Sequence, residues 1–235
     1  MYNATLIAVS GLDASGKSTQ VELIKQYLTD KNLKFEYVHF PKYGDNEASI
    51  VISSYLRGEY GDVKKVDPVF IANMYAMDRF LYLPTLNKQL AENDVLLLDR
   101  YVFCNMAFQG AKYNTSIQSS IIREWIDEFE FGFLELPYPD LNIFFDVPID
   151  IIKERLQHRS ENESHLKDIH EADIEFQSRV RDNYLALKTY DNFEVVDCAR
   201  RISAEESNIE NLKTYTPTEL FDEYKYLLDK TLLIR

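Results

Sequence analysis

The stretch Gly11-Leu12-Asp13-Ala14-Ser15-Gly16-Lys17-Ser18 fits the pattern G-x-x-x-x-G-K-[ST] of a phosphate-binding loop. It follows the apolar run Thr5–Val9, which predicts a buried strand, and it precedes a predicted helix near Ser18–Thr29. The glycines of such a loop let the backbone curl around phosphates, so that successive N–H groups and the positive end of the helix face the anion. The stretch therefore predicts a nucleotide-binding site.

Particular roles follow for three residues of the loop. Lys17 is expected to reach the β and γ oxygens of ATP, and Ser18 to ligate Mg²⁺. Asp13 is less generic, because a carboxylate beside polyphosphate is repelled unless a cation offsets it; it either positions Mg²⁺ or its water, or only caps a local turn. The predicted ATP contacts of the loop are Gly11, Asp13, Ala14, Ser15, Gly16, Lys17, Ser18 and Thr19.

The rest of the chain alternates apolar runs with helical periodicity. Further strands are predicted at Phe35–Phe40, Val95–Leu98, Leu141–Phe145 and Phe193–Val196. Helices are predicted near Asn46–Leu56, Pro68–Glu92, Ser116–Phe129, Ile149–Gln157, Ala172–Thr189 and Pro217–Thr231. Strands that alternate with helices imply a parallel sheet covered on both faces. We predict one α/β domain over residues 1–235, a three-layer α/β/α P-loop fold with five parallel strands.

Composition limits the classes of partner. The 235 residues are 46% hydrophobic and 28% charged, as expected for one large domain, and the net charge of −13 disfavours nucleic acid or anionic membrane as a partner. No apolar run is long enough to span a bilayer and no signal peptide is recognisable, so a cytoplasmic protein is expected. Cys104 and Cys198 are far apart in no metal-ligand spacing, which argues against a disulfide framework or a zinc site.

Charged residues follow several predicted strands, and ligands in such sheets bind beyond the carboxyl ends of the strands. Asp99-Arg100 follows Val95–Leu98; a guanidinium binds phosphate bidentately, and the carboxylate could orient it or hold magnesium-bound water. The alternative is an ordinary salt bridge at a strand end. Tyr75 and Arg79 share a helix face. Either they present an aromatic ring and a guanidinium to a base, or Tyr75 belongs to the core and Arg79 caps a solvated face.

With these residues assembled, the chain resembles the thymidylate kinase family from about Thr5 to Val196. The landmarks that carry the resemblance occur in the family's order: Gly11–Gln20, Phe40-Pro41-Lys42-Tyr43, Tyr55-Leu56-Arg57-Gly58, Tyr75-Ala76-Met77-Asp78-Arg79, Asp99-Arg100-Tyr101, Ala107-Phe108-Gln109-Gly110 and Asp146-Val147-Pro148. The resemblance implies ATP-dependent phosphorylation of dTMP to dTDP with Mg²⁺, and a homodimer built through helices.

The resemblance also implies roles for single residues. Tyr75 would stack on thymine and Arg79 would bond a thymine carbonyl, with Asn105 and Phe108 beside the base and sugar. The dTMP-binding set implied by the family is Phe40, Pro41, Lys42, Tyr43, Tyr75, Arg79, Asp99, Arg100, Asn105, Phe108 and Glu171. A lid near residues 158–171 would bring Arg155 and Arg159 to ATP, and since Ala14 stands where some members carry arginine, Arg159 is the expected transition-state cation.

The catalytic set is then Lys17, Asp13, Arg100, Asp99 and Arg159, with Ser18 and Asp13 at the metal. Ser10 and Cys104 depart from the family's usual residues, and an insertion near residues 200–215 has no counterpart. Three alternatives remain: a deoxynucleoside kinase that phosphorylates a sugar hydroxyl with a carboxylate base, a GTPase-type switch, and a binding module without catalysis. Asn87-Lys88-Gln89-Leu90 lacks the final Asp of a guanine signature, which argues against the switch.

Overall fold

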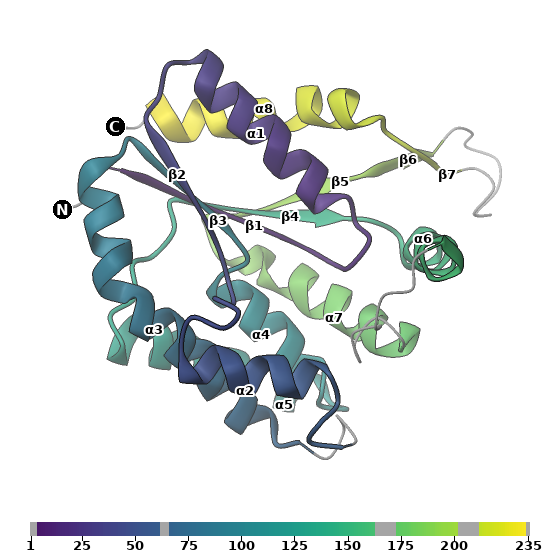
Figure 1. Ribbon diagram of the computed structural model, residues 1–235. Coiled ribbons are helices and arrows are strands. Elements are labelled where there is room, and N and C mark those ends of the chain that lie inside the picture. Colours follow the sequence, from purple (N-terminus) through teal and green to yellow (C-terminus); the bar gives the residue numbers. More distant parts are fainter. Residues whose placement is uncertain (1–3, 62–65, 163–172, 202–211, 234–235) are drawn as a thin grey trace.

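Five parallel strands form the central sheet of the computed structural model, which describes residues 4–61, 66–162, 173–201 and 212–233 (Figure 1). The strands lie in the order β2-β3-β1-β4-β5. Their bounds are β1 Thr5–Gly11, β2 Phe35–His39, β3 Val95–Asp99, β4 Leu141–Asp146 and β5 Phe193–Asp197. Every residue of β1, β3 and β4 is buried, as expected for strands covered by helices on both faces. The predicted five-stranded parallel sheet is confirmed.

Helices cover both faces of this sheet. Figure 1 shows α1 and α8 on one face, and α3, α4 and α7 on the other, with α2 and α5 packed outside them. The helices are α1 Lys17–Asp30, α2 Glu47–Leu56, α3 Pro68–Glu92, α4 Val102–Gly110, α5 Ser116–Asp127, α6 Ile149–Asn162, α7 Ile174–Ala186 and α8 Pro217–Leu233. A π-helical turn, Glu128–Phe133, follows α5, and the short 3-10 helix Leu187–Thr189 follows α7.

Local sequence explains where several helices begin. Asn46 caps α2 through a reciprocal pair of hydrogen bonds with Ser49, and the Asp67 side chain accepts the Phe70 N–H at the start of α3. Pro68 occupies the first position of α3, where its missing N–H costs nothing. These caps fix the two helices that form one wall of the site.

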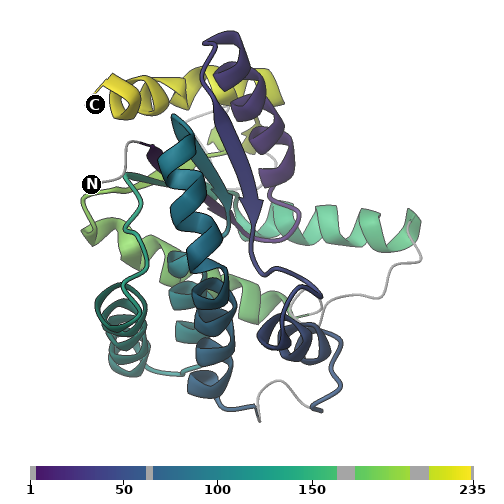
Figure 2. The same ribbon diagram turned by 60° about the vertical axis from the view of Figure 1, so that its left-hand side comes forward.

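The structure differs from the sequence prediction in three places. Helix α4 was not predicted, because most of its side chains are buried and no polar face gives it a helical period. Helix α6 continues to Asn162, whereas the prediction ended this helix at Gln157 and placed a lid near residues 158–171; α6 projects away from the sheet edge where β4 ends (Figure 2). The segment predicted as a polar insertion contains an antiparallel pair, β6 Ala199–Arg201 and β7 Leu212–Thr214.

A continuous hydrophobic cluster joins the layers from Ala4 to Leu228. Phe103 of α4 lies at an aromatic centre of this cluster, with its ring centroid 5.1 Å from Tyr190 and 5.5 Å from Phe193. Among the described residues, no helix combines the length and the apolar character that crossing a bilayer would require.

Candidate active site

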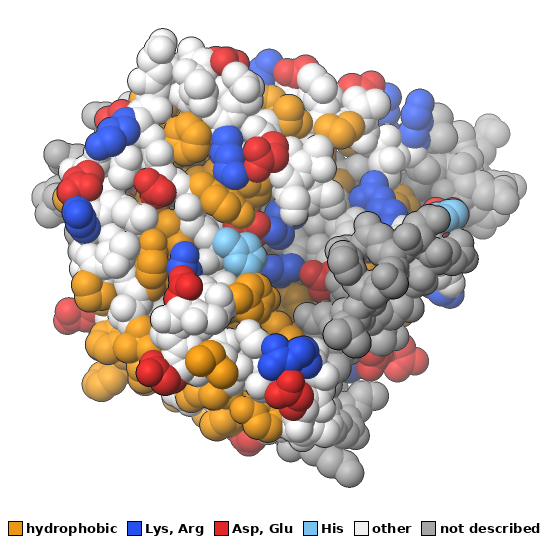
Figure 3. Space-filling view, in the orientation of Figure 1, with side chains coloured by type: hydrophobic (Ala, Val, Ile, Leu, Met, Phe, Trp, Pro, Cys, Tyr) orange, Lys and Arg blue, Asp and Glu red, His pale blue; other side chains and the backbone are white. Residues whose placement is uncertain are grey.

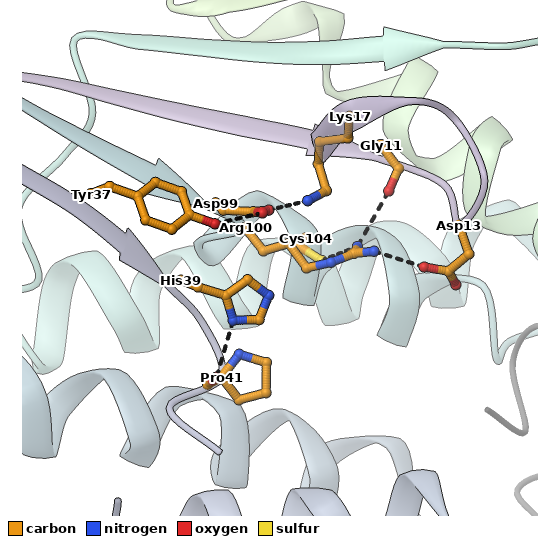
Figure 4. A network of polar contacts seen from close by, with 9 residues as sticks. All are labelled: Gly11, Asp13, Lys17, Tyr37, His39, Pro41, Asp99, Arg100 and Cys104. Carbon is orange, nitrogen blue, oxygen red and sulfur yellow. Dashed lines mark hydrogen bonds and ion pairs between the residues drawn. The ribbon is translucent and has the colours of Figure 1, made fainter. Parts of the chain in front are cut away.

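The phosphate-binding loop joins the end of β1 to the start of α1 (Figure 4). Two of its residues have left-handed backbone conformations, Ala14 with φ 58° and Gly16 with φ 87°. Glycine adopts this conformation without steric cost, which accounts for its use directly before the helix. The Thr19 N–H donates to the Gly16 carbonyl at 3.1 Å, so α1 begins at the loop and its free N–H groups face the cavity above it.

The Lys17 ammonium forms a buried ion pair with Asp99 at the end of β3 (Figure 4). The Tyr37 hydroxyl donates to the other oxygen of Asp99 at 3.1 Å. Burial, together with the positive charge of Arg100, lowers the pKa of Lys17 below its ordinary value, while Asp99 opposes this shift. Burial disfavours the ionised carboxylate of Asp99, but the charge and hydrogen bond of Lys17, together with the charges of Arg100 and His39, outweigh it and hold that pKa below its ordinary value. The pair is therefore charged and held beneath the loop.

Arg100 bridges the end of β3 and the phosphate-binding loop. Its Nη2 donates to the Asp13 carboxylate at 2.8 Å, and its Nη1 donates to the Gly11 carbonyl at 3.2 Å and contacts Cys104 Sγ at 3.4 Å. Arg100 has φ 65°, and a left-handed backbone in a residue other than glycine costs about 1–3 kcal/mol. This strain is retained where the backbone turns the guanidinium toward the loop.

Two cavities meet at this point. The first, which we call the phosphate cavity, is lined by Leu12, Asp13, Ala14, Ser15, Gly16, Lys17, Ser18, Thr19, Gln20, Arg100, Arg155, Cys198, Tyr215, Pro217 and Leu220. The second, the acceptor cavity, is lined by Asp13, Phe40, Pro41, Tyr43, Leu56, Tyr75, Arg79, Arg100, Tyr101, Cys104, Asn105, Phe108 and Gln109. Its empty volume, which includes space open to solvent, is about 570 Å³. Asp13 and Arg100 line both cavities, so the two are adjacent.

Most of the residues predicted for the site line one of these cavities. The exceptions include Lys42, whose ammonium lies 4.7 Å from the Tyr82 ring centroid and 3.8 Å from an Asp45 oxygen and which does not line the acceptor cavity. Asp99 lies behind the loop against Lys17. Glu171 and the side chain of Arg159 lie outside the part of the chain that the structure describes.

The structure gives the partners of several side chains for which the sequence left alternatives open. Asp13 binds Arg100, so its carboxylate does more than cap a turn of its own loop. Asp99 and Arg100 each pair across the site with a residue of the loop, rather than with each other. Arg155 donates to the Ala14 carbonyl at 3.1 Å, which places it on the loop. Arg79 is 2% exposed, which excludes a solvated face for it.

Sequence reasoning missed the partners of these residues. Glu130, fully buried in the π-helical turn, accepts hydrogen bonds from Arg79 and Asn105. Gln177 of α7 donates to Asp13 at 3.4 Å, and Arg181 of the same helix binds Asp146 through two hydrogen bonds. The available signal for Glu130 was a carboxylate within the apolar run Phe129-Glu130-Phe131, which is unusual unless the charge is paired.

A strand, a phosphate-binding loop and a helix beside a second cavity that shares an arginine with it define a P-loop nucleotide kinase. The fold agrees with that of a solved thymidylate kinase from Candida albicans, with a TM-score of 0.66 and 19% identity over 99% of this chain and 95% of that one. The profile of the family described as Thymidylate kinase matches residues 9–209. The chain belongs to the thymidylate kinase family.

Relatives come from distant organisms. The thymidylate kinase of Mycobacterium tuberculosis is 30% identical over 183 residues, which cover 77% of this chain and 85% of the relative. The thymidylate kinase of Homo sapiens is 29% identical over 144 residues, 61% of each chain. A probable thymidylate kinase of Saccharolobus solfataricus is 28% identical over 83% of this chain and 89% of its own. The family expected from the sequence is confirmed.

Proposed function

We propose that this protein transfers the γ-phosphoryl group of ATP to dTMP and forms dTDP. The observation that carries this proposal is the pair of adjacent cavities that share Asp13 and Arg100. A triphosphate on the loop and a monophosphate in the acceptor cavity would meet at the Arg100 guanidinium, where in-line attack needs them.

The chemistry requires no covalent intermediate on the protein. An acceptor phosphate oxygen attacks the γ-phosphorus of ATP, the bond from that phosphorus to the oxygen bridging the β- and γ-phosphates breaks, and ADP leaves. The protein orients both groups and offsets their charge. Lys17 leaves Asp99 or is shared with it when the triphosphate arrives, and Arg100 bridges the donor and acceptor phosphates. Arg155, already on the loop, and Arg159 further along α6 supply lid charges in this proposal.

Magnesium fits the oxygen donors at the loop. The Ser18 hydroxyl lies at the exposed side of the phosphate cavity, and the Asp13 carboxylate lies in its wall. Mg²⁺ is commonly bound by a few oxygen ligands of the protein, and substrate phosphates complete its coordination. When bound, the ion would neutralise charge on the phosphates. Ser18 and Asp13 remain the residues that we expect to hold it.

A panel of acceptors tests the activity. ADP release is measured with ATP, Mg²⁺ and each of dTMP, dUMP, dCMP, dGMP and thymidine, in the wild type and in Lys17→Ala and Arg100→Ala. We expect dTMP to be the best acceptor and each variant to lose about 10²-fold or more in kcat/KM. Activity with thymidine but not dTMP would point to a deoxynucleoside kinase, and hydrolysis that no acceptor changes would contradict a kinase.

The proposed assembly is a homodimer through α3. This helix exposes Phe70, Met77, Phe80 and Leu81 at spacings that put them on one stripe, and Figure 3 shows hydrophobic side chains gathered at the lower left, where Figure 1 places α3. Sedimentation velocity should show a dimer for the wild type and a monomer for Leu81→Asp, with Tyr226→Asp on the exposed face of α8 as the control. A wild-type monomer would contradict the proposal.

A single domain and a cytoplasmic location stay predictions from the sequence.

A further inference from the structure

Glu130 is fully buried and binds Arg79 and Asn105, two residues that line the acceptor cavity, although it does not line the cavity itself. It belongs to the π-helical turn Glu128–Phe133, in which the Leu134 N–H donates to the Phe129 carbonyl five residues earlier. Such turns are rare and occur frequently at functional sites. The turn directs a carboxylate into the protein interior, where it has to be paired.

Both oxygens of Glu130 are used to hold residues that line the cavity. Arg79 Nε and Nη2 each donate to Glu130 at 2.6 Å in a parallel, bidentate pair. Among the described residues these are the hydrogen bonds that Arg79 makes, so its Nη1 remains for a ligand. The Arg79 guanidinium therefore has one fixed orientation in the wall of the cavity.

The orientation of the Asn105 amide follows from the same carboxylate. Asn105 Nδ2 donates to Glu130 at 2.8 Å and to the Ala72 carbonyl at 3.1 Å. A carboxylate and a carbonyl only accept, so the amide nitrogen has to face them and the oxygen has to face away. Gln109 Nε2 donates to that oxygen at 3.2 Å, which leaves it one further lone pair. Glu130 thereby fixes where Asn105 offers an acceptor.

We propose that Glu130 is a positioning residue for choice of the pyrimidine: it makes Arg79 present a donor and Asn105 an acceptor to the base. This inference rests on the proposed function. Thymine and uracil carry a carbonyl oxygen next to an N–H, which complements a donor beside an acceptor. Cytosine carries an amino group next to a bare ring nitrogen, which reverses the pattern and leaves the buried groups of the site unpaired.

Replacing Glu130 by glutamine tests the role of the carboxylate. The introduced side-chain amide would bring its own N–H₂ group toward donors, so Arg79 and the Asn105 amide lose their fixed orientations. We expect Glu130→Gln to lower the ratio of kcat/KM for dTMP over dCMP about tenfold or more, and to leave the ratio of dTMP over dUMP within about threefold. Both ratios are measured by competition between acceptors, which makes them independent of the fraction of enzyme that is folded.

Two further variants keep the test decisive. Asn105→Ala leaves the pair of Arg79 and Glu130 intact, and it should lower the ratio of kcat/KM for dTMP over dCMP on its own. The variant that combines it with Glu130→Gln should have a ratio no lower than that of the more affected single variant, because both substitutions act on the Asn105 amide. Glu128→Gln makes the same chemical change on an exposed carboxylate of the same turn and should change neither ratio.

The outcomes separate the two proposals. An unchanged ratio of dTMP over dCMP in Glu130→Gln or in Asn105→Ala would overturn the role of Glu130. Equal losses for dTMP, dUMP and dCMP in Glu130→Gln would also overturn it, since they would assign the carboxylate to structure alone. A wild type that phosphorylates none of these acceptors would instead refute the proposed function.

Discussion

At the scale of single residues, the ion pair between Lys17 and Asp99 decides how the loop is charged before ATP binds. Burial and Arg100 lower the Lys17 pKa, and Asp99 is the group that counteracts them. Asp99→Asn removes this counter-charge, so Lys17 should lose its proton at lower pH. We expect the alkaline limb of kcat/KM for ATP to move down by about one pH unit or more, measured from about pH 6 to 10.

The control for this prediction is Asp222→Asn, which changes an exposed carboxylate on α8. It should leave the pH profile in place. If Asp99→Asn lowered the rate equally at every pH, the carboxylate would not act on Lys17 through its charge, and the prediction would fail.

The sequence predicted many of these residues but few of their partners. Gly16, Lys17 and Arg100 were found because their roles depend on local features: a motif, a strand end and the start of a helix. The pair of Arg79 and Glu130 joins residues 51 positions apart, and that of Arg100 and Asp13 joins residues 87 apart. Such pairs depend on how helices and strands pack, so no local pattern could assign them.

At the scale of elements, α8 is tied to α1 directly beside the loop. The Tyr224 hydroxyl donates to Gln20 Oε1 at 3.1 Å, and Gln20 Nε2 donates to the Pro217 carbonyl at 3.1 Å. Tyr224→Phe would leave a buried amide oxygen without its donor. We expect the free energy of unfolding to fall by about 1–2 kcal/mol in urea titrations. Tyr226→Phe, on the exposed face of the same helix, should change it by less than about 0.5 kcal/mol.

Lys112, which follows the end of α4 and lies against Tyr55 of α2, destabilises the folded protein at low pH. The Lys112 ammonium is buried without a hydrogen-bond partner in the described parts of the chain, 4.7 Å from the Tyr55 ring centroid. Burial lowers the pKa of Lys112 to about 7, and Asp67 opposes the shift only in part. The folded protein therefore binds this proton less tightly than the unfolded chain does.

The sign of the pH dependence follows. Below pH 7 Lys112 is protonated in the folded and in the unfolded chain, and the full free-energy cost of burying its charge is present. Between pH 7 and 10.5 Lys112 is protonated in the unfolded chain but largely neutral in the folded one, so the stability of the wild type rises with pH. Lys112→Met should therefore stabilise the protein most near pH 6, and the gain should shrink by about 2 kcal/mol between pH 7 and 9. Lys88→Met, exposed on α3, should show no such trend in the same denaturant titrations.

At the scale of the whole molecule, the architecture was predictable because it repeats one rule. Apolar runs that alternate with helices gave the parallel sheet, and the carboxyl ends of β1, β2 and β3 met at one edge as expected. Helix α4 escaped prediction because burial on all sides removes the pattern on which such predictions depend. The two adjacent cavities could not be derived either, since they are the space left between side chains of distant segments.

Adjacent cavities make a prediction about ligands that span them. A molecule in which a polyphosphate chain joins adenosine to thymidine would occupy both cavities. It would lose translational entropy once on binding, whereas ATP and dTMP each lose it separately. It should raise the Tm more than ATP and dTMP do together at the same concentrations, because stabilisation grows with affinity. Arg100→Ala should abolish most of this excess, since the guanidinium lies where the cavities join. A bridged ligand that stabilises no better than ATP alone would mean that the phosphates of donor and acceptor do not meet in this fold.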